Sequence, residues 1–145
     1  MGTKAPPIFG VDLDHGPKVL FFFKVTCPVC QMAAPKVATF DRAYPGRFVA
    51  IGQDPPPKLV SFSKEFDLPG KLRDDPPPYP ASCAYGIRVV PTTFLVGEDG
   101  MILDAVESWD RDRLNDLSRQ LAELTGATYA PISDPSDGLP VFRPG

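Results

Sequence analysis

Residues 18–30 read KVLFFFKVTCPVC and place two cysteines, two residues apart, where a strand passes into a helix. Residues 19–25 are apolar on both alternating faces, which is typical of a strand covered on both sides of a sheet. Pro28 suits the first turn of the following helix, where a missing N–H costs little. The free N–H groups of that turn favour a thiolate at Cys27, and Cys30 is placed to resolve a mixed disulfide. The pattern predicts a redox-active cysteine pair.

The rest of the chain alternates apolar segments with turn signals, which favours one α/β domain built on a mixed sheet. The early segments predict parallel strands with right-handed crossovers, and a later hairpin adds antiparallel strands. The expected elements are a helix from Pro28 that stops before Pro45, a strand at 47–52, a helix from 55–57 to about 68–70, an edge strand at 71–73, a short helix at 81–85, hairpin strands at 92–96 and 101–106, and a helix capped by Asp110 that ends at Gly126.

The 19 prolines of the 145-residue chain cluster at 55–57, at 76–80 and from 131 to 144. We predict a single domain over residues 1–128 and a Pro-rich C-terminal tail over 129–145. The tail has little apolar periodicity, so we expect it to lie extended on the surface or to be partly disordered. Its last segment, 139–145, is expected to wrap the surface, with a partner-docking strand as the alternative.

Composition excludes several classes of protein. The formal net charge is −3 and the sequence pI is about 5.0, which does not fit a nucleic-acid-binding protein. The longest apolar run, at 19–23, is far short of the ~20 residues of a membrane span. The N-terminus lacks a hydrophobic signal core, so we expect a cytoplasmic protein, or an extracytoplasmic one whose targeting segment has been removed. We expect it to be a monomer.

Metal and cofactor binding are not expected. A metal site built from Cys27, Cys30 and the only histidine, His15, would lack a fourth ligand. The third cysteine, Cys83, is read first as a buried small apolar residue. The alternative is a third redox thiol, because Cys83 precedes the segment around Pro91.

Two spaced motifs carry a family resemblance. Residues 23–30 read FKVTCPVC and residues 85–96 read YGIRVVPTTFLV, and together they resemble the thioredoxin fold. The resemblance implies that Pro91 is cis and packs against the cysteines, and that Val90 offers its backbone to an extended substrate chain. We assign to the substrate-binding surface Thr26, Pro28, Val29, Val90 and Pro91.

The stretch between Cys30 and Pro91 is longer than in a minimal thioredoxin and leaves room for a βα-type insertion. With the hairpin at 97–102, it resembles the TlpA/ResA-like branch of the AhpC/TSA or redoxin group, over about residues 5–125. The resemblance implies a thiol–disulfide oxidoreductase that acts on protein thiols and disulfides and has an upstream redox partner.

The chain also departs from its relatives near the cysteines. Thr26 stands where many relatives have tryptophan, Phe21 where thioredoxins have a buried aspartate, and Ala33 where ResA-like proteins often have glutamate. The substitutes considered for the missing acid or for a thiolate-stabilising charge are Lys24, Asp104 and Glu107. No general base is assigned from the sequence.

Two other functions stay open. A peroxiredoxin-like thiol peroxidase needs a Pro-x-x-x-Thr-x-x-Cys motif, but Leu20 and Lys24 stand at those positions before Cys27. For Cys30 the same positions are Phe23 and Cys27, so the motif fails for both cysteines. The second alternative is a non-catalytic redox or metal-binding module.

Overall fold

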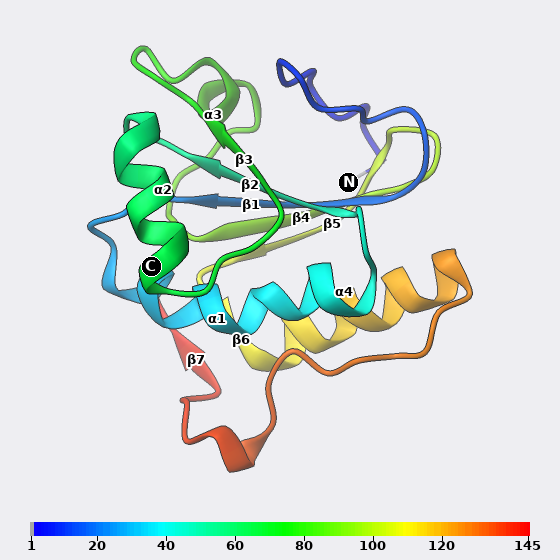
Figure 1. Ribbon diagram of the computed structural model, residues 1–145. Coiled ribbons are helices and arrows are strands. Elements are labelled where there is room, and N and C mark those ends of the chain that lie inside the picture. The colour runs from blue at the N-terminus through cyan, green and yellow to red at the C-terminus, as the bar shows by residue number, and fades with distance from the viewer. Residues whose placement is uncertain (1) are drawn as a thin grey trace.

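A five-stranded mixed sheet forms the centre of the computed structural model, which describes residues 2–145 (Figure 1). Its strand order is β3-β2-β1-β4-β5. β1 runs parallel to β2 and β2 to β3, whereas β4 is antiparallel to both β1 and β5. The strands span Lys18–Phe23 (β1), Phe48–Gly52 (β2), Lys71–Asp74 (β3), Thr92–Val96 (β4) and Ile102–Glu107 (β5). The predicted mixed sheet is confirmed.

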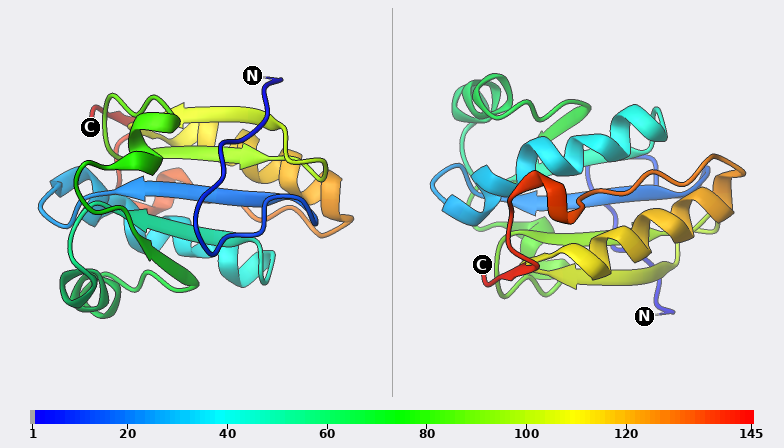
Figure 2. Two further views of the ribbon diagram at one scale, coloured as in Figure 1. Left: turned by 90° about the horizontal axis from the view of Figure 1, so that it is seen from above. Right: turned by 90° about the horizontal axis from the view of Figure 1, so that it is seen from below.

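Helices cover one face of this sheet. Figure 2 shows α1 (Pro28–Ala43) and α4 (Arg111–Thr125) side by side beneath the strands. Phe21 and Phe23 point into this layer, because alternate residues of a strand face opposite sides. α2 (Pro56–Glu65) adds Leu59 and Phe62 to the same core.

The opposite face is covered by the N-terminal segment and by the short helix α3 (Pro80–Ala84). Phe22 points to this side, where its ring lies 5.1 Å from the ring of Tyr85 and 5.7 Å from that of Phe94. Both faces of β1 are therefore buried, as its continuous apolar run predicts.

The expected bounds hold for the last helix, α4, but not for α2. The helix expected to reach 68–70 ends at Glu65, because Asp67 takes a left-handed backbone conformation with φ 53°. The last helix is as predicted: Asp110 accepts a hydrogen bond from the amide of Arg113 at 3.2 Å, and Gly126 ends the helix with φ 71°.

In the described residues 2–145, no helix is long and apolar enough to cross a membrane.

The C-terminal tail is ordered and packed rather than loose. After α4 it runs back over the α1–α4 layer (Figure 2), with Ile132 and Ser133 only 3% and 4% exposed. It forms a 3₁₀ turn at Pro135–Asp137 and a strand, β7 (Phe142–Arg143), that pairs with β6 (Trp109–Asp110). The tail lies along the surface, as one of the two expectations had it, and the alternative of partial disorder was wrong. Side chains of Asn115 and Ser118 on α4 donate hydrogen bonds to its backbone carbonyls and hold it where apolar periodicity is lacking. The division at residue 128 stays a prediction.

Candidate active site

The antiparallel pairing of β1 with β4 brings the two sequence motifs together. Phe22 of β1 is opposite Thr92 of β4, so the end of β1 and the start of β4 lie at the same edge of the sheet. Cys27 follows this end of β1, and Sγ of Cys27 lies 3.5 Å from the carbonyl oxygen of Val90. The Val90–Pro91 peptide bond is cis, as the resemblance implies.

Cys27 is the N-cap residue of α1. Its Sγ accepts a hydrogen bond from the amide of Cys30 at 3.1 Å, and both thiols are free. The first-turn amides of a helix are unpaired and carry partial positive charge. A thiolate on Cys27 would accept this N–H and would face the positive end of the helix.

The two cysteines differ in access and in acidity. Cys27 is partly exposed, whereas Cys30 is fully buried among apolar residues of α1 and β1. Burial, and next the hydrogen bond to Cys27, raise the pKa of the Cys30 thiol far above its ordinary value. At neutral pH Cys30 is thus protonated and Cys27 is the accessible nucleophile.

Two polar side chains that the sequence reasoning missed hold the loop before Cys27. Oδ2 of Asp54 accepts a hydrogen bond from the amide of Val25 at 2.8 Å, and Nε2 of Gln31 donates to the Val25 carbonyl at 2.9 Å. Asp54 follows β2, the parallel neighbour of β1, and a polar residue just after such a strand was the available signal. These bonds fix the backbone that leads into Cys27.

The predicted substrate-binding residues are placed unequally. Thr26 and Pro28 are exposed on either side of Cys27, and Val90 is half-buried. Val29 is only 5% exposed and packs in the core, so its side chain does not belong to the surface beside the cysteines. Pro91 is buried at the start of β4.

The candidate acids are engaged with other side chains. Asp104 accepts hydrogen bonds from Arg113 at 2.8 Å and from Gln120 at 2.9 Å. Glu107 forms an exposed pair with Arg88 at 2.8 Å. Lys24 is exposed. Phe21 and Ala33, at the family's acidic positions, are buried apolar residues, and no general base is assigned.

Cys83 is exposed on α3, so the expectation of a buried residue was wrong. In this one-turn helix the buried side chain is that of Ser82, which donates to the carboxylate of Asp75 at 2.6 Å. The Cys83 thiol points instead toward the carbonyl of Pro78 at 3.7 Å. Asp75 also accepts bonds from the amides of Ala81 and Ser82, at 2.9 and 2.8 Å, and so orders the start of α3.

His15 lies apart from the cysteines in sequence and pairs with Asp12, with 3.0 Å between Nδ1 and Oδ2. Among residues 2–145, no three His, Cys, Asp or Glu side chains gather closely enough to hold a metal ion.

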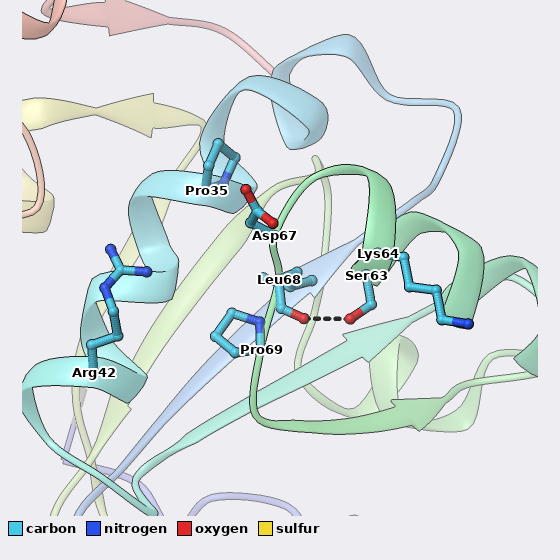
Figure 3. A pocket seen from close by; sticks show the side chains of 7 residues that line it. All are labelled: Pro35, Arg42, Ser63, Lys64, Asp67, Leu68 and Pro69. Carbon is cyan, nitrogen blue, oxygen red and sulfur yellow. Dashed lines mark hydrogen bonds between the residues drawn. The ribbon is translucent and has the colours of Figure 1, made fainter.

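One surface hollow does not contain the cysteines. Its volume is about 610 Å³, and Figure 3 shows it between α1 and the segment that follows α2. Its lining residues are Pro35, Arg42, Ser63, Lys64, Asp67, Leu68 and Pro69. A second hollow of about 450 Å³ adjoins the active-site loop, since Val25 and Gln31 line it together with Phe62 and Phe66.

No protein-family model matches the chain, and no curated protein matches it. Several solved structures, however, match the chain. A candidate thiol:disulfide interchange protein DsbE from Chlorobium tepidum has a TM-score of 0.72 and 21% identity, over 85% of this chain and 96% of its own. DsbF of Mycobacterium tuberculosis has a TM-score of 0.65 and 25% identity, over 77% of this chain and 83% of its own.

A third neighbour is a secreted disulfide oxidoreductase of Mycobacterium tuberculosis, homologous to DsbE of Escherichia coli. Its TM-score is 0.65 and its identity 24%, over 85% of this chain and 94% of its own. The superpositions cover most of this chain and of each neighbour, and the neighbours share the arrangement of sheet and helices. The chain has the thioredoxin fold, and its structural neighbours include proteins described as DsbE or as homologous to DsbE.

Proposed function

We propose that this protein is a thiol–disulfide oxidoreductase that acts on protein partners through Cys27 and Cys30. The observation that carries the proposal is the contact set of Cys27 Sγ, which lies 3.1 Å from the amide of Cys30 and 3.5 Å from the carbonyl of Val90. One contact stabilises the thiolate, and the other sets it beside backbone that can receive a substrate chain. The oxidoreductase neighbours support the same reading.

The reaction takes two exchange steps. The Cys27 thiolate attacks one sulfur of a partner disulfide, forms a mixed disulfide, and releases the other partner sulfur as a thiolate that takes up a proton. Cys30 then loses its proton and attacks Sγ of Cys27. The Cys27–Cys30 disulfide forms, and the second partner sulfur leaves as a thiol. Two electrons pass to the partner, and the reverse sequence oxidises a dithiol.

The surroundings of Cys27 suit a peptide rather than a cofactor. Thr26 and Pro28 expose small, uncharged surface beside the thiol, and Val90 supplies the backbone edge. In this proposal an upstream dithiol partner reduces the Cys27–Cys30 disulfide between turnovers, and the protein works as a monomer.

Insulin reduction by dithiothreitol tests the proposal. The wild type is expected to accelerate the precipitation of reduced insulin, and Cys27→Ser is expected to abolish the acceleration. Cys83→Ser is the matched control, because Cys83 is also exposed but lies on α3. A wild type no faster than Cys27→Ser contradicts the proposed function.

A further inference from the structure

The tip of the C-terminal tail lies against the backbone that the proposed function gives to a substrate. The amide of Gly145 donates to Oγ of Ser108 at 3.0 Å, and the amide of Ser108 donates to the Pro91 carbonyl at 2.8 Å. A methyl group added at Gly145 would overlap the carbonyl oxygen of Val90 and lie 3.5 Å from the nitrogen of Pro91. This carbonyl is the one that Sγ of Cys27 contacts. The space beside Val90 is therefore filled by the chain itself.

The base of the tail, residues 129–140, is firmly held. Arg111, 7% exposed at the start of α4, donates to the carbonyl of Leu139 at 2.7 Å and to Oγ of Ser133 at 3.1 Å. Asp137 forms an ion pair with Lys36 of α1 at 3.1 Å, and the side chains of Asp137 and Lys36 are 11% and 32% exposed. Such charge-assisted bonds in a poorly solvated setting resist detachment.

The tip, residues 141–145, is held much less firmly. All five residues are exposed, with Val141 and Phe142 at 52% and 54%. Its bonds are a two-residue ladder to β6, a hydrogen bond from the amide of Arg111 to the Val141 carbonyl at 2.8 Å, the contact of Gly145 with Ser108, and a 3.9 Å contact of the Arg143 guanidinium with Sδ of Met32. Short exposed ladders with little buried apolar surface open easily.

We propose that the tip is a displaceable cover of the substrate-binding edge. A protein partner that pairs its extended chain with Val90 must first lift residues 141–145, while the anchored base keeps the tip close by. A small disulfide needs only Sγ of Cys27 and reacts without lifting the tip. This inference rests on the proposed function and adds that access, not only thiol chemistry, limits exchange with proteins.

Gly145→Val separates these two kinds of substrate. The added side chain meets backbone atoms of Val90, which cannot rotate away, so residue 145 must move off Val90. Ser108→Ala removes the bond to the Gly145 amide and loosens the tip without adding bulk. Val141→Ala is the matched control. It shortens a half-exposed side chain of the tip and leaves Arg143, whose guanidinium contacts Met32, unchanged. All variants carry Cys83→Ser, which removes the other exposed thiol.

Gly145→Val and Ser108→Ala are both expected to reduce insulin several-fold faster than the parent and the Val141→Ala control. Their rates with the small disulfide 5,5′-dithiobis(2-nitrobenzoate) are expected to stay unchanged. Unchanged or slower insulin reduction, with the parent active, overturns the inference alone. A parent no faster than Cys27→Ser on insulin overturns the proposed function, so the two failures are distinguishable.

Hydrogen exchange gives a readout of the tip itself. In a Cys30→Ala variant the mixed disulfide on Cys27 cannot resolve, so either cysteamine or a cysteine-containing ten-residue peptide can be attached stably. The peptide adduct is expected to exchange amide hydrogens of residues 141–145 faster than the cysteamine adduct. Equal exchange in the two adducts means that the peptide leaves the tip in place, and overturns the inference.

Discussion

The amide of Cys30 donates a hydrogen bond to Sγ of Cys27 at 3.1 Å, and this single turn of helix gives the two cysteines unequal chemistry. The sulfur that accepts the bond is partly exposed, and the residue that donates it is fully buried.

Alkylation should separate the two cysteines. Iodoacetamide at neutral pH is expected to modify Cys27 at least about tenfold faster than Cys30, because Cys30 is buried and its pKa is raised. Peptide mass mapping of the Cys83→Ser variant measures both rates, and urea-unfolded protein is the control in which the difference disappears. Equal labelling of the folded protein contradicts this assignment of roles.

Asp54→Ala should weaken the support of the active-site loop. The amide of Val25 loses its carboxylate partner, which costs about 1–3 kcal/mol of unfolding free energy when the group stays shielded from water. We expect a lower urea midpoint and insulin reduction slowed several-fold. Asp74→Asn, at the exposed end of β3, is the control with both properties unchanged. Loss of stability with full activity would show that the loop keeps its shape without Asp54.

Removing the acids of β5 should leave the thiolate unaffected. Asp104 accepts hydrogen bonds from Arg113 and Gln120, and Glu107 pairs with Arg88. In Asp104→Ala and Glu107→Ala, the pH midpoint of thiolate absorbance near 240 nm is therefore expected to match the parent, with Cys83→Ser present in each. A clear shift in either variant identifies a substitute for the missing acid.

Asp137 should stabilise the protein in a pH-dependent way. The hydroxyl of Ser133, and next the amide of Leu139 and Lys36, lower the pKa of Asp137 well below its ordinary 3.8. A lowered pKa means that the stabilisation is complete above pH 3.8 and is lost as the pH falls through the folded-state value. Asp137→Asn is expected to cost about 1–2 kcal/mol at neutral pH and progressively less in strong acid.

Urea unfolding of the parent and Asp137→Asn at pH values from neutral to strongly acid measures this dependence. Asp116→Asn is the matched control, because this aspartate of α4 is half exposed, lies 4.0 Å from Arg119 and accepts one exposed hydrogen bond from Gln120 at 3.1 Å. A gap between parent and Asp137→Asn that persists unchanged in strong acid would assign the effect to packing rather than to charge.

The sheet and the cysteine pair could be predicted because local patterns determine them. Three consecutive phenylalanines require burial on both faces of β1, and Pro28 marks the helix start. The partnership of Val90 with Cys27 came from the resemblance, since no local pattern links residues 63 positions apart.

What could not be predicted depends on tertiary partners. Asp54 and Asp75 read as ordinary loop residues, and only the folded chain shows that each accepts bonds from backbone amides. The tail lacks apolar periodicity because single side chains hold it, chiefly Arg111 bonding to Leu139 and Ser133. Such contacts leave no repeating signal in the sequence.

Trp109 offers a spectroscopic view of the tail. It is the only tryptophan in the chain, it is fully buried, and its Nε1 donates to the carbonyl of Pro140 at 2.8 Å. The backbone of Trp109 also pairs with Arg143 of the tip, so this residue contacts the tail on both sides of Val141. A red shift of its emission therefore signals that the tail has moved away from the indole. The intrinsic fluorescence of the unlabelled protein can thus report movement of the tail without an added probe.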